Sequence, residues 1–177
     1  MWNFKLIQNI GHFFLKRSLG QILLFIVLVC SVFFGYKGDK KEILPSFNVL
    51  LMDSSTVFST DTIPYGKPFV MMYFSPDCEH CQKQVEDLLK NMDRFRNIHF
   101  YFFTPFQFHL LKSFYEYYHL YNYPNITIGF DNRFFLPNHF NARSTPWVFI
   151  YNDKKRLERV YEGGLTTAQL MDALSKI

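Results

Sequence analysis

Residues 69–81 read FVMMYFSPDCEHC, and this stretch decides the fold. Its first six residues are all apolar, and a turn-forming segment, 64–67, precedes them. A continuous apolar run of this length, bounded by turn signals, predicts a strand buried on both faces of a sheet. After the second cysteine, apolar residues recur at helical spacing from Val85 to Phe95, which predicts an amphipathic helix. Cys78 and Cys81 therefore lie where a buried strand passes into a helix.

The rest of the chain alternates between strand and helix patterns. Further strands are expected at 47–52, 56–59, 98–103, 126–130, 146–151 and 157–161. Residues 104–107 resemble a capping box that opens a second long helix, residues 133–140 are expected to be helical or irregular, and residues 166–169 cap a last helix. This order predicts an α/β fold around a mostly parallel sheet.

The net charge of +4 belongs to the N-terminal segment. Residues 1–41 hold six Lys or Arg and one acidic residue, whereas residues 42–177 hold 13 Lys or Arg and 14 Asp or Glu. The globular part thus has no excess of positive charge with which to bind a phosphate backbone. The charge distribution therefore argues against nucleic acid as a partner.

Residues 18–36 form an uncharged, mainly apolar stretch between Arg17 and Lys37. Nineteen residues suit a single membrane-spanning helix. A cleaved signal peptide and lipid attachment at Cys30 are the alternatives. However, the sequence lacks the small residues that a signal-peptide cleavage site or a lipid-attachment site requires. The expected organisation is a short N-terminal segment at 1–17, a transmembrane helix at 18–36, a linker at 37–44 and a globular domain at 45–177. Lysines flank both ends of the apolar stretch, so charge alone does not orient it.

The spacing of Cys78 and Cys81 suits dithiol chemistry. Residues three apart face the same side of a helix, so the two sulfur atoms can come within bonding distance. The first turn of a helix favours negative charge and lowers the pKa of a thiol there. Cys78 is therefore expected to be the nucleophile and Cys81 the resolving cysteine. A structural zinc site would need four ligands, and the only other cysteine is Cys30; copper handling with a distant histidine stays open.

The motif order resembles the thioredoxin superfamily. A strand leads into the sequence Ser75-Pro76-Asp77 and a C-x-x-C pair, a helix follows, and Thr145-Pro146 later opens another strand. The segments 45–47 and 66–68 and the turn at Asp53 resemble the TlpA/ResA-like branch, whose central insertion matches residues 105–130. The resemblance implies a central mixed sheet flanked by helices, covers residues 45–177, and implies a membrane-anchored thiol–disulfide oxidoreductase.

The resemblance also implies roles for residues near the dithiol. Pro146 matches a cis-proline beside the cysteines, and Thr145 would pair with an extended client peptide. The chain departs from thioredoxin in having Asp77 in place of a tryptophan and Met72 in place of a buried aspartate. The proton acceptor for Cys81 is therefore open.

Three nearby side chains are candidates for supporting the thiols. They are Glu79, His80 and Lys67. A protonated His80 would stabilise the Cys78 thiolate, which favours an oxidase, whereas Glu79 would oppose it. The resemblance favours a reductase.

The expected partners are protein disulfides or dithiols and an upstream thiol electron donor, with no cofactor and no metal. The domain is expected to face the periplasmic or extracytoplasmic side of a bacterial inner membrane, where clients contain disulfides. A peroxiredoxin-like peroxidase is an alternative, because Ser75 precedes Cys78 at the spacing of that family's motif. A copper-handling thioredoxin-like metallochaperone is the other.

Overall fold

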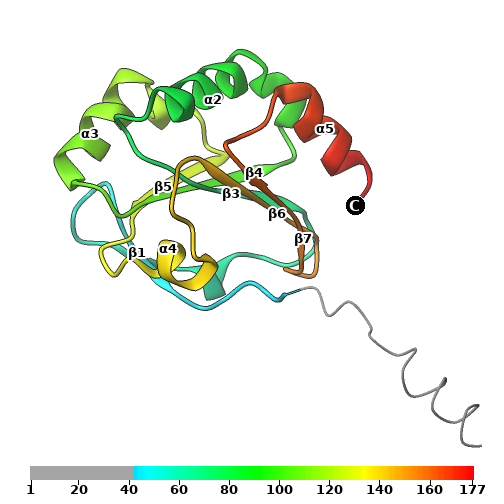
Figure 1. Cartoon of the computed structure of the whole chain (residues 1–177), viewed down its shortest axis with the longest axis horizontal. Coiled ribbons are helices and arrows are strands. Elements are labelled where there is room, and N and C mark those ends of the chain that lie inside the picture. The colour runs from blue at the N-terminus through cyan, green and yellow to red at the C-terminus, as the bar shows by residue number, and fades with distance from the viewer. Residues whose placement is uncertain (1–41) are drawn as a thin grey trace, which may run out of the picture. The chain divides into compact units, whose positions relative to one another are not determined.

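The computed structural model describes residues 42–177 (Figure 1). The predicted segments 1–17 and 18–36, and residues 37–41 of the predicted linker, lie outside the described residues. Across 42–177, every helix is too short or too polar to cross a bilayer.

Seven strands form one mixed sheet. The strands are β1 (Asn48–Leu51), β2 (Val57–Ser59), β3 (Phe69–Tyr73), β4 (His99–Thr104), β5 (Ile126–Phe130), β6 (Trp147–Tyr151) and β7 (Leu157–Glu162). Their order in the sheet is β2-β1-β5-β4-β3-β6-β7. The central strands β3, β4 and β5 are parallel, and every other pairing is antiparallel. The mixed sheet confirms the fold implied by the resemblance. The mostly parallel sheet expected from the order of elements is wrong, because β1 and β2 form a hairpin and β6 and β7 form another, and both hairpins join the parallel strands in the antiparallel sense.

Helices cover both faces of the sheet. They are α2 (Glu79–Lys90), α3 (Phe108–Tyr117), α4 (Phe135–Phe140) and α5 (Thr167–Ser175), with short 3-10 turns η1 (Thr60–Thr62), η2 (Met92–Phe95) and η3 (Leu120–Asn122). Helices α2, α3 and α5 lie along one face, and α4 lies on the other (Figure 1). Since both faces are covered, β3 is buried along its whole length and β4 along all but its first residue.

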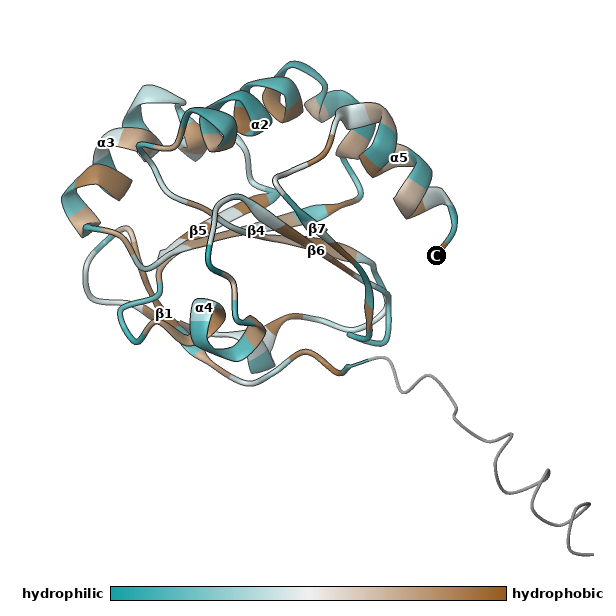
Figure 2. Ribbon diagram, viewed as in Figure 1, coloured by the Kyte–Doolittle hydropathy of each residue, from teal (hydrophilic) through white to brown (hydrophobic). Residues whose placement is uncertain are grey.

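Strand β3 shows how one run of residues serves two cores. Val70 and Met72 point toward α2, α3 and α5, while Phe69, Met71 and Tyr73 point toward the α4 side. Hydrophobic segments accordingly line the sheet and the inner sides of the helices (Figure 2). All five residues of β3 are buried, as the continuous apolar run predicted.

Three local predictions had different outcomes. The capping box at 166–169 is confirmed, with the Thr166 hydroxyl and the Gln169 side chain both engaged. The capping box at 104–107 is wrong, because Thr104 ends β4 and its hydroxyl accepts from the Phe106 amide 3.2 Å away, so α3 begins only at Phe108. The apolar stripe continues past Lys90, but its last residues lie in η2, not in α2.

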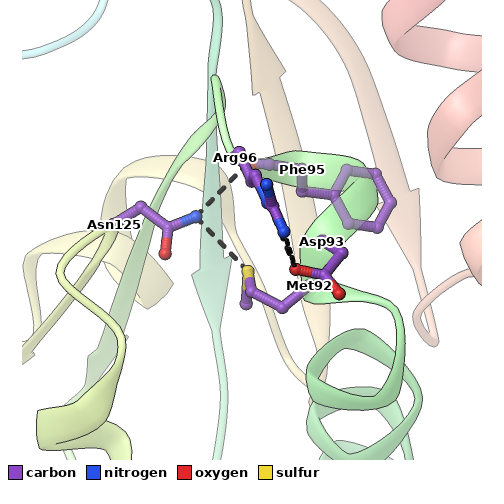
Figure 3. A network of polar contacts seen from close by, with 5 residues as sticks. All are labelled: Met92, Asp93, Phe95, Arg96 and Asn125. Carbon is purple, nitrogen blue, oxygen red and sulfur yellow. Dashed lines mark hydrogen bonds and ion pairs between the residues drawn. The ribbon is translucent and has the colours of Figure 1, made fainter.

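A side-chain amide secures the end of the sheet where β3 begins (Figure 3). Asn125, just before β5, directs its Nδ2 toward the carbonyl oxygens of Phe95 at 3.3 Å and Ile98 at 3.0 Å and toward the Met92 sulfur at 3.3 Å. Beside this cluster, Arg96 and Asp93 form an exposed ion pair at 2.6 Å. The amide ties η2 to the start of β5.

Residues 42–44, assigned to the linker from sequence, are paired with the turn between β6 and β7. Ile43 bridges Arg156, and the Leu44 amide donates to the Lys155 carbonyl at 2.9 Å. These hydrogen bonds lie at the end of β6 that adjoins the start of β3. The chain thus enters the described domain at the end of the sheet opposite to the cysteines.

Candidate redox site

The two cysteines lie at the junction of β3 and α2. The chain leaves β3 at Tyr73, and α2 begins at Glu79, so Cys78 is the residue that precedes the helix. Cys81 lies one turn into the helix and is 0% exposed, whereas Cys78 is partly exposed. Both are free thiols. Only Cys78 can meet a partner directly.

The sulfur of Cys78 is surrounded by hydrogen-bonding groups. Burial raises the pKa of the Cys78 thiol, but hydrogen bonds with the Cys81 and Thr145 side chains and with the backbone amides of Cys81 and His80 outweigh it, and the pKa falls below its ordinary value. The Cys78 sulfur also lies 3.6 Å from the Thr145 carbonyl oxygen. Amides at the start of a helix are unpaired within the helix and stabilise a thiolate.

Cys81 has the opposite electrostatic environment. Burial, together with the hydrogen bond to Cys78 and the charge on Cys78, raises the pKa of Cys81 to about 12. Cys78 therefore loses its proton before Cys81 as the pH rises. The geometry distinguishes an attacking thiolate from a buried thiol that acts second.

The loop before Cys78 is held in place by two polar contacts. The Ser75 hydroxyl donates to a carboxylate oxygen of Asp77, and the Gln82 side-chain amide donates to the Pro76 carbonyl at 2.9 Å. Asp77 itself is exposed. These contacts fix the approach to Cys78 on the α3 side.

Thr145 and Pro146 flank Cys78 on the β6 side. The peptide bond between them is cis, and Pro146 is buried. The Pro146 carbonyl accepts from the Gly163 amide at 2.8 Å, which fastens this loop to the end of β7. The structure thus brings Thr145 and Pro146 to the dithiol, as the resemblance implied.

Helix α2 is also fastened to the segment that follows β7. The Gln84 side-chain oxygen accepts from the Leu165 amide at 2.7 Å, and Asp87 accepts from the Thr167 amide at 3.0 Å. Gly164 has a φ of +82°, and a Cβ there would lie 2.7 Å from the Gln84 oxygen and 3.2 Å from Pro146. This close approach favours a glycine at position 164. It lets α2, the loop that contains Pro146 and the segment after β7 pack against one another beside Cys78.

The three predicted supporting side chains are placed differently. Glu79 and His80 are exposed beside Cys78, and Glu79 pairs with Lys83 at 2.7 Å, which lowers the pKa of Glu79. Lys67 precedes β3 at its far end, whereas Cys78 follows the near end. Five strand residues span roughly 15 Å. Lys67 is therefore not part of the site, and that prediction is corrected.

Asp131 is a buried acid that sequence reasoning missed. It is 0% exposed and accepts from the Phe135 and Leu136 amides, each at 2.9 Å. Burial, then Asp131 and then Cys81, raises the pKa of Tyr73, so these groups lie within electrostatic reach of one another. A signal was present in the sequence, since an aspartate directly after a strand often caps the next helix.

Within residues 42–177, His, Cys, Asp and Glu side chains do not gather in groups of three or more with a geometry that could hold a metal ion.

The fold was compared with known proteins. Residues 60–177 match the family described as thioredoxin-like domain. No curated protein sequence matches the chain. Among solved structures, a secreted Mycobacterium tuberculosis disulfide oxidoreductase homologous to E. coli DsbE has a TM-score of 0.61 and 16% identity, over 74% of this chain and 96% of that one.

Two further structures show the breadth of the fold. StoA from Bacillus subtilis has a TM-score of 0.56 and 16% identity, over 73% of this chain and 96% of that one. A thiol peroxidase from Chromobacterium violaceum has a TM-score of 0.61 and 13% identity, over 77% of this chain and 86% of that one. At these identities the three structures show that the fold is shared. The family match covers most of the chain, and the protein therefore belongs to the thioredoxin-like domain family.

Proposed function

We propose that this protein is a thiol–disulfide oxidoreductase that reduces protein disulfides through Cys78 and Cys81. The observation that carries the proposal is the contrast between the two thiols. Cys78 is partly exposed with a lowered pKa, and Cys81 is buried with a pKa raised to about 12. This contrast suits a two-step exchange in which one sulfur attacks and the other waits.

In the first step the Cys78 thiolate attacks one sulfur of a client disulfide. A Cys78–client bond forms, the client disulfide breaks, and the other client sulfur leaves as a thiolate. The Thr145 carbonyl oxygen lies 3.6 Å from the Cys78 sulfur. An extended client segment bound at Cys78 would therefore pair with the backbone of the loop before Pro146.

In the second step Cys81 attacks the Cys78 sulfur, so that the Cys78–Cys81 disulfide forms, the Cys78–client bond breaks and the second client sulfur leaves as a thiolate. The negative charge on Cys78 is gone once the mixed disulfide forms, so the hydrogen bond and charge that raise the Cys81 pKa no longer act. The departing client thiolates take up the proton of Cys81 and one from solvent. Two electrons have then moved from the Cys78–Cys81 dithiol to the client, which leaves as two thiols.

Trapping tests the proposal. A Cys81→Ser variant is expected to accumulate a mixed disulfide with client proteins through Cys78, which mass spectrometry of the native host would identify. A Cys78→Ser variant is the control and should trap nothing. Failure of Cys81→Ser to trap any protein, while its Cys78 remains reactive toward iodoacetamide, would contradict protein disulfides as clients.

The reductive direction is tested by the reduction potential of the dithiol. The resemblance to the TlpA/ResA-like branch favours a reductant. We expect a value of about −230 mV or lower, on the side of thioredoxin and not of strong oxidants. Equilibration with glutathione buffers measures it, and a value above roughly −180 mV would indicate an oxidase.

A peroxidase is the second candidate, favoured by the fold shared with the thiol peroxidase and by Ser75 three residues before Cys78. Consumption of hydrogen peroxide by the reduced protein, at a rate that exceeds peptide disulfide exchange, would establish it. A tight copper(I) complex that protects both thiols, without disulfide exchange, would instead indicate copper handling.

Residues 18–36 are proposed as the membrane anchor, with the domain on the extracytoplasmic side. Support comes from the uncharged length of that segment and from the need of such an enzyme for disulfide-containing clients. An alkaline phosphatase fusion after Ile177 should be active, and an inactive, stable fusion would place the domain in the cytoplasm.

A further inference from the structure

A groove runs beside Cys78 between α2 and α3. It encloses about 420 Å³ and begins at Pro76 and Asp77, directly before Cys78. Leu110 and Phe114 of α3 are among the apolar residues that line it. Tyr117, with 74% of its surface exposed, stands at its edge. The groove lies on the opposite side of Cys78 from Thr145, because α3 follows β4 and Thr145 precedes β6 on the other side of β3.

The charges that line this groove are all negative. Asp77 and Glu86 contribute carboxylates, and no Lys, Arg or His of the described residues lines it. One oxygen of each carboxylate is engaged, since Ser75 donates to Asp77 and the Tyr118 hydroxyl donates to Glu86 at 3.2 Å. The second oxygen of each has no hydrogen-bond partner among residues 42–177 in the structure.

The nearby lysines are committed elsewhere. The Lys83 ammonium is bonded to Glu79 at 2.7 Å, and the Lys112 ammonium lies over the Phe108 ring, 5.1 Å from its centroid. Neither Asp77 nor Glu86 forms an ion pair within residues 42–177. Lys83 lies within electrostatic reach of Glu86, but its ammonium is bonded to Glu79. The groove therefore combines an apolar wall with two carboxylates that have no direct ion-pair partner within residues 42–177.

We propose that this groove binds a Lys or Arg side chain of the client, next to the cysteine that Cys78 attacks. The aliphatic stem of such a residue would pack against Leu110 and Phe114, its cationic head would reach Glu86 and Asp77, and Tyr117 offers a ring face to the cation. This inference rests on the proposed exchange at Cys78. It assigns the substrate class: protein disulfides flanked by basic residues.

Peptide disulfides of matched sequence test the assignment. Three short peptides, with Arg, norleucine or Glu on both sides of a single cysteine, are oxidised to symmetric disulfide dimers. The reduced full chain is mixed with each, and thiol release gives the rate constant of exchange. Each value is divided by the rate constant of the same peptide with dithiothreitol, which removes intrinsic differences in peptide reactivity.

The wild type is expected to prefer the Arg peptide over the Glu peptide by about tenfold, an amount in line with one hydrogen bond to a charged group. Glu86→Gln should reduce this preference to threefold or less, and Glu86→Lys should reverse it. The matched control is Glu116→Gln, which removes the same charge from the exposed surface of α3 outside the groove and should keep the preference. Raising the salt concentration should weaken the wild-type preference.

Tyr117→Ala separates the contribution of the ring from that of the carboxylates. It should slow exchange with the Arg peptide by a few-fold factor, and less with the norleucine peptide, which has no cation to lie over the ring, and it should leave the effect of Glu86→Gln in place.

Two results would overturn the inference. If the normalised rates for the Arg and Glu peptides are equal, or if Glu86→Gln keeps the full preference, the groove does not select basic clients, while the proposed disulfide exchange stands. If the reduced wild type exchanges with none of the three peptides, the proposed function fails and the inference fails with it.

Discussion

The two ends of strand β3 consist of similar apolar residues, but their surroundings have different roles. At its amino end, Asn125 ties η2 to β5 through amide contacts of 3.0 and 3.3 Å, and residues 42–44 pair with the β6–β7 turn. At its carboxyl end, the polar groups converge on one sulfur atom, and one flank is an open groove. At the amino end of β3, hydrogen bonds between segments stabilise the fold. At its carboxyl end, the Cys78 sulfur and the groove beside it are accessible to a binding partner.

The largest expected contrast is between the two thiols of the carboxyl end. Iodoacetamide should modify Cys78 at least about a thousandfold faster than Cys81 at pH 7, because alkylation requires the thiolate. The Cys78 rate should rise with pH and reach half its maximum at a lower pH than the rate of a free cysteine, since the pKa of Cys78 is lowered. Cys81, with a pKa raised to about 12, should stay unmodified to pH 10.

Mass spectrometry after timed alkylation measures both rates. Rapid labelling of Cys81 at neutral pH, or a half-point for Cys78 above that of a free cysteine, would contradict the assignment of attacker and resolver.

A glycine at each end offers the next comparison. Gly164→Ala and Gly66→Ala both place a side chain at a positive φ, of +82° and +91°, which costs about 1–2 kcal/mol of unfolding free energy. Only at Gly164 would the new Cβ meet Gln84 and Pro146. Gly164→Ala should therefore lose about 1 kcal/mol more, by analogy with overpacked sites, and slow disulfide exchange several-fold.

Urea denaturation and peptide disulfide exchange measure these two effects. Equal losses in the two variants, with exchange unchanged in both, would mean that the contact with Gln84 and Pro146 does not position the site.

Asn125→Ala tests the closed end. Losing the amide leaves the Phe95 and Ile98 carbonyls without this partner, and we expect the free energy of unfolding to fall by about 1–3 kcal/mol. Exchange by the folded fraction should not change. Asn132→Ala, an exposed asparagine in the loop after β5, is the control and should cost little. A variant that loses activity without losing stability would show that the two ends are coupled.

The smallest effect is expected at the exposed ion pair of the site. Glu79→Gln breaks a pair whose side chains are 74% and 65% exposed, so it should change stability by less than about 0.5 kcal/mol. Asp172→Asn breaks a similar pair on α5 and serves as the reference. Exchange rates should stay within threefold in Glu79→Gln, and a larger change would restore Glu79 as a tuning residue.

Patterns of residue type predicted the parts of the fold that depend on burial. The apolar run of β3, the short strands and the capping box at Thr166 were correct because local sequence and packing agree there. The helix start at 104–107 failed because Thr104 serves as the last strand residue, paired with Phe130, and strand pairing overrides a local cap signal. Tertiary contacts decided the outcome.

The site shows the same limit. Cys78, Cys81, Thr145 and Pro146 were found from sequence because their motifs are local or matched to a family. Lys67 was misplaced because nearness along the chain hid the length of β3 between it and Cys78. The groove with Glu86 was missed since it forms only when α3 packs beside α2, which spacing within either helix does not reveal.

The complete burial of Cys81 limits which molecules can react with its thiol. A small oxidant or a free thiol from solution reaches only the Cys78 sulfur, so in the proposed exchange Cys81 reacts only with that sulfur. The second step of the proposed exchange is thus unimolecular and does not depend on the concentration of any solute. In that exchange a client bound to Cys78 either departs unchanged or leaves reduced, and no other molecule competes for the thiol of Cys81.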